Sequence, residues 1–594
     1  MSEISPPLSQ KVGYGVVVGL GLSFAAGMIL VTRALKRTIG EDNSKVETFI
    51  VADRRVQTGL ITSAVVSSWL WSTMLLSTTL VTYQYGVSGP FWYGAGCSPM
   101  IVSFAYLGAV CKKRIPSAHT VLEIIKLRYG TTAHISFIFL AIINNLFNTI
   151  NMILGAASAI TFLTGMHIMA STFLLPLGVI IYTLMGGIKA TFLTDYIHTF
   201  IILILCCYLT IKALTDTQIG SIGGLYDLVL AAQPRHFVEG NYQGSLFTMT
   251  SQQGIFFGII LLISNFGTVI MDTGYFTKAF AASSEAVTPG YVIGGISYFS
   301  IPWSVGSIMG LTMSSSELTN GLALPYAAMA VAGKGGAVAT LLMTFMAVTS
   351  TLSAQVIAVS SIVAFDLYRT YWNKNAENKA LIRWSQIGVV LFGLIAAGLT
   401  AVFHFIGLDM GWTLYMIASA WLGMASGIAT WLGTAYHFHG KVDISTTGQT
   451  LPCMYGTIVS AFTPLLYSIT ITLAAPDEFE WEDFKKHDMT IRSENEPVEA
   501  YEDQSQSLSQ MRSTRYAFLW AAATFLGHWV IWPLPMYAAK YIFSKGFFIA
   551  WIAVGQIWLW ATLLIVGFYP LWDARDRIIS LTEKLFQSIV SIFG

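Results

Sequence analysis

The sequence predicts an all-α polytopic membrane protein with about fourteen transmembrane helices. Hydrophobic residues make up 54% of the 594-residue chain and charged residues only 11%, whereas about 25% of the residues of a soluble chain are charged. Apolar stretches of about 20 residues, the length needed to cross the hydrocarbon core, recur along the whole chain. The formal net charge of +1 gives no basic excess that would indicate a nucleic-acid partner.

The apolar stretches give the expected helices in chain order. They cover residues 11–34, 58–84, 88–111, 134–164, 169–187, 190–214, 252–280, 287–312, 332–368, 382–404, 409–434, 453–474, 516–538 and 547–570. The two longest connections, 215–251 and 475–515, are polar and are expected to be loops, so we expect residues 1–594 to form a single transmembrane domain. The stretch 11–34 is expected to be a retained helix, because it lacks the short apolar core and cleavage site of a signal peptide.

Basic residues in the short connections predict the orientation, because Lys and Arg concentrate in cytoplasmic loops. The first and third connections are basic; their Lys and Arg residues are Arg33, Lys36, Arg37, Lys45, Arg54, Arg55, Lys112, Lys113, Arg114, Lys126 and Arg128. The turn at 86–89 between them has none, so we expect an extracellular N-terminus. The side of the C-terminus stays open, because fourteen crossings place it outside whereas Arg575, Arg577 and Lys584 favour the inside.

Two of the expected helices have polar centres that predict breaks. The stretch 58–84 contains Ser63, Ser67, Ser68, Ser72 and Thr73, and the stretch 252–280 contains Ser-Asn-Phe-Gly-Thr at 264–268 and then Asp272. A bilayer tolerates irregular backbone only where protein buries it or a cavity adjoins it. The two segments are second and seventh in order, the relation expected of two inverted five-helix repeats that enclose a binding site. The alternative is that the serines only assist helix packing.

Two carboxylates at membrane depth, Asp195 and Asp272, are candidate functional residues. A carboxylate there is costly, so a functional role is the first expectation. The alternative places them at the membrane face, and Asp195 soon follows the polar run Gly-Gly-Ile-Lys at 186–189.

Hydroxyl and aromatic side chains suggest a solute and cation site. Ser350 and Thr351 offer hydroxyls in an apolar helix, and hard alkali cations prefer oxygen ligands. Trp69 offers an aromatic face for a flat solute in mid-helix. The alternatives are serines that bond back to their own helix and a tryptophan in the interfacial belt. Asn144, Asn148 and Asn151 form a further polar stripe, for which pore lining and interhelical bonding both stay open.

The chain has no pattern of catalytic residues, and we expect it not to be an enzyme. No glycine loop with a lysine cradles phosphates, and no HExxH motif is present. His437 and His439 point to different helix faces and have no third ligand nearby. The five cysteines lie in or beside apolar stretches, which indicates packing rather than a disulfide framework.

Six longer motifs form a specific pattern: VGYGVVVG at 12–19, YGVSGPFWY at 85–93, ATFLTDY at 190–196, AVTST at 347–351, IAVSS at 357–361 and WPLPM at 532–536. The pattern resembles the fungal high-affinity urea transporters of the sodium:solute symporter family, from about residue 11 to about residue 585. The resemblance implies a leucine-transporter-type inverted five-helix repeat with extra helices at both ends. In this division 11–34 is the N-terminal extra helix, 58–214 the first repeat, 252–434 the second repeat and 453–570 the C-terminal extra helices.

The resemblance also implies site residues. The cation site would use the hydroxyls of Ser350 and Thr351 and the carbonyls of Ala347, Ser63 and Val66. The substrate positions would be Trp69, Tyr93, Thr120, Asp272 and Tyr415. No cofactor is implied, and no metal beyond a possible sodium ion.

Three apolar residues depart from the family pattern. Urea-transporting members have glutamine at the position of Leu76, asparagine at that of Leu261 and serine at that of Met424, while Cys97 replaces a small alanine. Urea has four N–H donors and one carbonyl, and each buried polar group left unpaired costs about 1–3 kcal/mol. A related, less polar solute is therefore an open alternative.

The sequence thus predicts cation-coupled secondary active uptake of urea or a related small solute across the plasma membrane, by alternating access. The coupling ion is a proton, which the resemblance favours and which Asp272 or Asp195 would carry, or sodium at the Ser350 and Thr351 site. The partners are the solute and membrane lipid. The alternatives are a nutrient sensor that does not transport and a transporter of another solute, such as polyamines or amides.

Overall fold

The structure is a computed structural model with helices throughout the part of the chain that it describes. The described residues are 5–39, 43–312, 322–420, 423–476, 479–480, 484, 487, 489, 491, 508–576, 578–580 and 582–583. Within them eleven helices are long and apolar enough to cross a membrane, and the bent pair α4 (Thr58–Trp69) and α5 (Ser72–Tyr85) gives a twelfth span. The all-α polytopic prediction is confirmed.

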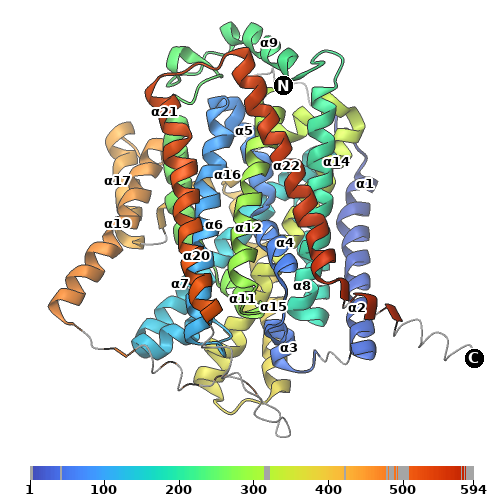
Figure 1. Cartoon of the computed structure of the whole chain (residues 1–594), viewed down its shortest axis with the longest axis vertical. Helices are drawn as coiled ribbons and strands as arrows, with labels where there is room; N and C mark the ends of the chain where they lie inside the picture. Colours follow the sequence, from blue (N-terminus) through green and yellow to red (C-terminus); the bar gives the residue numbers. More distant parts are fainter. Residues whose placement is uncertain are drawn as a thin grey trace, which may run out of the picture.

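The long helices run side by side as a bundle (Figure 1). Their bounds are α1 (Gln10–Tyr14) with α2 (Gly21–Ile39), α6 (Ser88–Arg114), α7 (Val121–Thr164), α8 (Ile168–Leu214), α10 (Gln252–Met271), α12 (Val287–Ile301), α14 (Ala323–Ser361), α15 (Asn378–Phe405), α19 (Thr450–Ala474), α20 (Leu508–Phe525) and α22 (Lys545–Asp573). Short helices mark the two ends of the bundle: α3 (Val46–Val51) lies at one end and α9 (Ile222–Ala232) at the other (Figure 1). We call these the α3 end and the α9 end. Helix α9 lies within the predicted loop 215–251.

Helix α8 folds back on itself at Gly187. Its 47 residues would extend about 70 Å as one straight helix, over twice the hydrocarbon thickness. Gly187 has φ 57° and ψ −149°, a conformation that only glycine adopts readily. On one side of it the Tyr182 hydroxyl donates to the carbonyl of Thr349 (3.2 Å), and on the other Asp195 accepts from the Ser350 hydroxyl (2.9 Å). Both limbs reach the same turn of α14, so the stretches 169–187 and 190–214 are separate limbs, as the sequence predicts.

The expected helix at 409–434 is wrong as a single crossing. The chain forms α16 (Met410–Ala420) and α17 (Met424–His439), which fold back on each other. The ring of Trp412 lies 5.6 Å from the ring of Trp431, and both indole N–H groups donate to Thr447. Nineteen residues of continuous helix would separate the two tryptophans by about 28 Å. Hydropathy detected the apolar stretch but not its reversal of direction.

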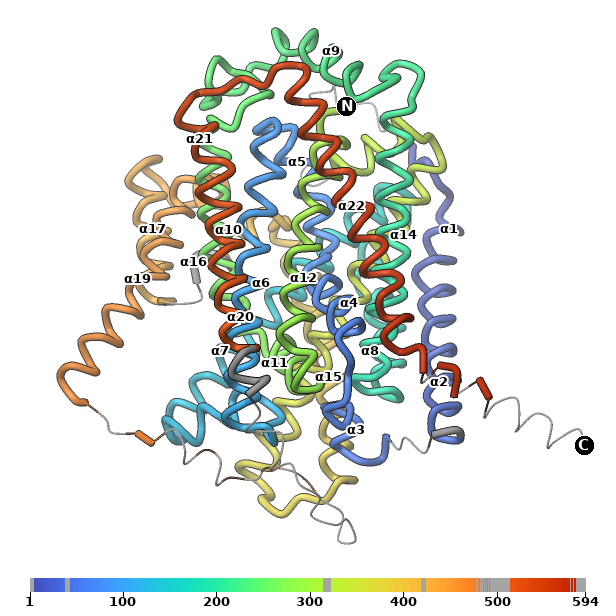
Figure 2. Tube along the Cα trace, in the orientation of Figure 1, coloured from blue at the N-terminus to red at the C-terminus, as the bar shows by residue number. Residues whose placement is uncertain are grey.

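The start of the first long helix and the end of the last long helix lie at opposite ends of the bundle. The backbone N–H of Leu8, just before α1, donates to the carbonyl of Leu163 at the end of α7. At the other end of the bundle the Asp573 carboxylate, which closes α22, accepts from the N–H of Gly59 at the start of α4 (2.8 Å). Figures 1 and 2 show α22 running from the α9 end towards the α3 end. The count of fourteen crossings is not confirmed.

We predict that Gly187→Ala destabilises the protein by more than about 3 kcal/mol, because a Cβ there would lie 2.4 Å from the Phe49 carbonyl oxygen in a strained backbone region. Gly130→Ala measures the backbone strain without a steric clash, since Gly130 has φ +78° and open space around its Cβ position. It should lower stability by about 1–3 kcal/mol. Gly398→Ala, with no atom within 4 Å of its Cβ position, is the control. Thermal unfolding in detergent checks the order; equal midpoints for all three variants would refute it.

Candidate functional site

The first break lies between α4 and α5. Helix α4 ends at Trp69, α5 starts at Ser72, and the two helices differ in direction by 59°. The N–H of Leu70 donates back to the carbonyls of Val66 (3.0 Å) and Ser67 (3.1 Å). The Ser72 hydroxyl donates to the carbonyl of Met152 on α7 (2.9 Å). The break predicted by the serines is therefore present and is buried against a neighbouring helix.

The second break lies at Asp272, between α10 and α11 (Thr273–Ala281). Asp272 leaves the helical conformation, with φ −78° and ψ 98°, and its carboxylate caps α11 by accepting from the N–H of Gly274 (2.8 Å). The other carboxylate oxygen accepts from the Gln355 side-chain amide on α14 (3.1 Å). The side chain is buried, at 6% exposure. Asp272 thus lies in the break and not at the membrane face.

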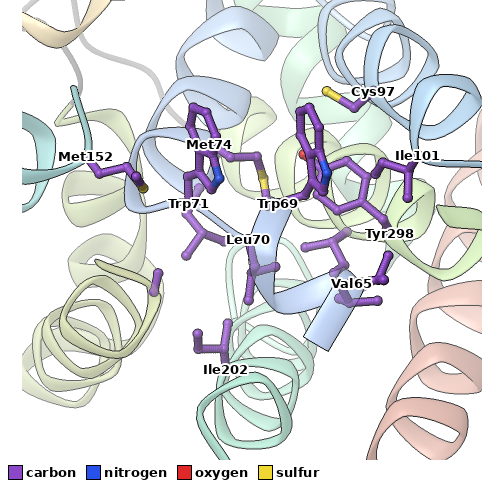
Figure 3. Packing of buried hydrophobic residues seen from close by; sticks show 14 of the residues in the cluster. Val65, Trp69, Leu70, Trp71, Met74, Cys97, Ile101, Met152, Ile202 and Tyr298 are labelled. Atoms are coloured by element: carbon purple, nitrogen blue, oxygen red, sulfur yellow. The ribbon is translucent and has the colours of Figure 1, made fainter. Parts of the chain in front are cut away.

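Aromatic rings join the two breaks. The Trp69 ring lies 5.8 Å from Tyr275, three residues after Asp272, and 6.4 Å from Tyr298 on α12. Figure 3 shows Trp69 beside Tyr298 and Cys97, with Trp71 on the other side of Met74. The two breaks therefore meet at an aromatic cluster.

Three buried polar atoms of this cluster have no hydrogen-bond partner among the residues that the structure describes. They are the Trp69 indole N–H, the Tyr275 hydroxyl and the Gln355 side-chain carbonyl. Buried polar groups are normally paired, so each such atom requires an explanation. Together they present donors and an acceptor to a small polar molecule.

The two tryptophans of the first break do not form a sandwich. The rings of Trp69 and Trp71 are nearly parallel, 7° apart, with centroids separated by 5.9 Å. A flat solute between two rings needs two contacts of about 3.5 Å, or about 7 Å in total. The 5.9 Å separation is smaller than this, so a solute would lie against one outer face of the pair and not between the rings.

The structure does not bring all five expected substrate residues together. Tyr93 is buried with its ring 5.8 Å from Phe257. Tyr415 shares a hydrogen bond with Thr450 (3.3 Å), where α16 contacts α19. Tyr93 lies close enough to interact electrostatically with Tyr298 of the aromatic cluster, whereas the Tyr415 hydrogen bond is to α19.

Thr120 lies at the start of α7, apart from the breaks. Its hydroxyl caps α7 by accepting from the N–H of Glu123 (3.2 Å) and donates to Asp366 (3.0 Å). Asp366 is eleven residues beyond Gln355 along one helical stretch, which corresponds to about 16 Å. Thr120 therefore stabilises the start of α7 and does not lie at the aromatic cluster.

The expected cation ligands lie close to a buried ion pair. The Thr351 hydroxyl donates to the Ala347 carbonyl (2.9 Å), and the Val66 carbonyl accepts from Leu70. The Ser350 hydroxyl donates to Asp195 (2.9 Å) and contacts the Ser67 hydroxyl. The hydroxyl of Ser63 is buried and without a partner among the described residues.

Lys278 on α11 is a site residue that the sequence reasoning missed. Its ammonium lies 2.8 Å from the Asp195 carboxylate, and both side chains are at most 3% exposed. It also donates to the Ala64 carbonyl (3.0 Å) and the Ser68 hydroxyl (2.5 Å). A lysine inside the stretch 252–280 was itself a signal, because ionisable residues at membrane depth are rare and functional.

Comparison with known proteins identifies the family. Residues 49–433 match the model of the sodium:solute symporter family. This chain belongs to the sodium:solute symporter family. It is thus a transporter of this family and not an enzyme.

Relatives of this symporter match nearly its full length. It is 40% identical to the "Probable urea active transporter 1" of Schizosaccharomyces pombe and 36% identical to the "Urea active transporter" of Saccharomyces cerevisiae, each match covering 99% of this chain and 94% of the relative. It is 33% identical to the "Urea-proton symporter DUR3" of Oryza sativa, over 98% of this chain and 87% of the relative. A solved Na⁺-coupled sialic acid symporter shares its fold, with a TM-score of 0.55, 15% identity and coverage of 77% of this chain and 98% of that one.

The three apolar departures of this symporter lie in different surroundings. Leu76 lines a cavity of about 230 Å³, which begins one turn beyond the first break and also contacts Gly155 and Asp409. Leu261 is buried, at 2% exposure, against Gly96. Met424 is 38% exposed. Leu76 thus borders a space that a solute could occupy.

Within the asparagine stripe of the symporter, Asn148 donates to Asn144 inside α7 (3.4 Å), whereas Asn151 and the neighbouring Asn145 bond to other helices. Asn145 donates to the Thr273 hydroxyl (3.0 Å), next to Asp272, and Asn151 donates to the Met410 carbonyl (2.6 Å). The Asn145 bond therefore supports the second break, while the Asn144 amide nitrogen and the Asn148 amide oxygen are buried without a partner among the described residues.

A cluster of charged residues lies at the α3 end of the symporter. His119 contacts Glu47 (2.6 Å) and Glu123 (3.4 Å), and Arg54 contacts Glu47 (3.2 Å). Burial alone would raise the pKa of Glu47, but the charges of His119 and Arg54 outweigh it and lower that pKa to about 2. Burial would lower the pKa of His119, but the carboxylates of Glu47 and Glu123 raise it above its usual value.

We predict that Glu47→Gln lowers stability by about 2–3 kcal/mol, and more at about pH 6 than at about pH 9. The lowered pKa of Glu47 gives stability that is complete above pH 4.5 and is lost as the pH falls towards 2. The raised pKa of His119 gives stability that is complete below pH 6.5 and is lost as the pH rises through its folded value. Thermal midpoints across this range check it, with Glu239→Gln on the exposed surface as control. A difference that does not depend on pH contradicts the role of His119.

Proposed function

We propose that this symporter couples the entry of a proton to the uptake of urea across the plasma membrane. The names of the relatives support urea, since those from both yeasts are urea active transporters, and the rice relative supports the proton. These relatives are matched along almost their whole length, so the comparison includes both breaks.

The unpaired polar atoms at the two breaks are the observation that carries the proposal. Urea offers one carbonyl acceptor and four N–H donors on a flat frame. The Trp69 indole N–H and the Tyr275 hydroxyl can donate to that carbonyl, while the Gln355 carbonyl and the Asp272 carboxylate can accept from the amides. The Trp69 face contacts the plane of the solute. The three unpaired atoms, on Trp69, Tyr275 and Gln355, would then each have a hydrogen-bond partner.

In the proposed transport cycle, the helices change direction at the two breaks. The helices near 58–111 and 252–312 move against those near 134–187 and 332–404, so that the site opens to one side at a time. The cavity beside Leu76 lies along α5 towards the α9 end and forms the path by which the solute enters. Basic loops and the α3 end then face the cytoplasm, and the N-terminus faces outwards.

Asp272 is the proposed carrier of the coupling proton. It lies in the second break, it is buried, and its partners Gly274 and Gln355 are uncharged donors. A carboxylate that bonds only neutral groups can take and release a proton without breaking an ion pair. Asp195, the other candidate, is held in an ion pair with Lys278.

Uptake of labelled urea tests the function. Cells that lack other urea uptake and express the symporter should accumulate urea above the outside concentration, and a protonophore should abolish the excess. Asp272→Asn should permit equilibration at most, whereas Asp227→Asn on the exposed helix α9 should behave as wild type. Absence of urea uptake, or accumulation that the protonophore leaves intact, overturns the proposal.

We predict that Leu76→Gln lowers the urea concentration for half-maximal uptake about two- to tenfold, because it adds one hydrogen-bond partner to the entry cavity. Met424→Ser is the matched control, since Met424 is 38% exposed and should have no effect. A gain from Met424→Ser without a gain from Leu76→Gln would place the solute path elsewhere.

A further inference from the structure

We infer that the protein's own cation, the ammonium of Lys278, lies beside the position expected for a free coupling sodium ion and takes over its role. This inference rests on the proposed transport function and concerns its ion selectivity. The ammonium is surrounded by the Ala64 carbonyl (3.0 Å), the Ser68 hydroxyl (2.5 Å) and the Asp195 carboxylate (2.8 Å). Carbonyl, hydroxyl and carboxylate oxygens are the ligands that a hard cation would use.

The neighbouring oxygens are engaged around this ammonium. Asp195 accepts from Lys278 through one oxygen and from Ser350 through the other (2.9 Å). Ser350 also contacts the Ser67 hydroxyl, and Thr351 is bonded to Ala347. The hydroxyls expected to bind sodium therefore bond to protein groups instead.

Charge balance also excludes a second cation here. In the described part of the chain Lys278 and Asp195 form an ion pair with each other and with no other side chain, and this pair neutralises the charge of both. A sodium ion at the Ser350 hydroxyl would lie close to the ammonium that already pairs with Asp195, and like charges repel strongly away from water. The residues present do not fit a sodium ion.

The ammonium joins the parts that must move. Lys278 follows the second break on α11, and Ala64 and Ser68 precede the first break on α4. Asp195 lies on the second limb of α8, and Ser350 lies on α14. Lys278 thus links both broken helices to the rest of the bundle through a single ammonium group. The sodium concentration then has no part in the transport cycle.

Lys112 shows how a purely structural buried lysine differs. Its ammonium donates to the carbonyls of Ala279 (3.3 Å) and Phe280 (3.0 Å) and contacts that of Ala282. These are the orphan carbonyls at the end of α11, which a cation stabilises as a cap. No carboxylate pairs with Lys112 in the described residues. Lys112 on α6, which binds the end of α11, is therefore the matched control for Lys278.

Cation replacement tests the inference. Wild-type cells should take up urea equally in sodium, potassium and choline media. Lys278→Ala should lose at least tenfold of that uptake in choline and recover part of it when sodium or methylammonium is added, because a small cation can enter the space beside Asp195. Lys278→Arg should remain independent of sodium, and Lys112→Ala should not become sodium-dependent.

Thermal unfolding of the purified proteins gives a readout that needs no solute. Sodium chloride should stabilise Lys278→Ala more than potassium chloride does, and should have no such effect on wild type or Lys112→Ala. A sodium requirement in wild type, or sodium-specific stabilisation of wild type, overturns the inference. Full uptake by Lys278→Ala in choline also overturns it. Absence of urea uptake with the expected unfolding results overturns the proposed function alone.

Discussion

The structure depends on pairing the backbone and polar groups that two broken helices leave inside the bundle. An interrupted helix has free N–H and C=O groups at each side of the break, and water is excluded from most of this interior. The Asp272 carboxylate pairs with the start of α11, the Leu70 N–H turns back to α4, and Ser72 bonds to α7. Lys278 supplies a donor to the Ala64 carbonyl. The atoms still unpaired after this, on Trp69, Tyr275 and Gln355, mark the space for the solute.

Much of the fold could be predicted from the sequence, because apolar length and polar interruption are local properties. Both breaks fall where serines and Asp272 interrupt apolar stretches. The predicted starts at 134 and 332 lie close to Gly130 and Gly333, which have positive φ and bend α7 and α14. The boundary at 187 coincides with the fold in α8. The reversal between α16 and α17 was missed, because hydropathy contains no direction.

The candidate site was predictable only in part, because contacts between distant segments decide its chemistry. Asp195 and Asp272 looked alike in sequence, yet one is in an ion pair and the other accepts only from uncharged donors. Their difference arises from Lys278, 83 residues from Asp195 in the chain. Thr120 was carried over by resemblance, but its partners are Glu123 and Asp366 at a helix start.

Helix α11 is fixed at both of its termini by side chains of opposite charge. The Asp272 carboxylate caps its first turn, and the Lys112 ammonium from α6 binds its last carbonyls. The strand-like bridge between Val56 and Ala282 then ties its end to the segment before α4. A nine-residue helix held in this way is about 13 Å of rigid rod. A displacement at the terminus beside Asp272 is consequently transmitted to the segment that leads into α4, because so short a rod bends little.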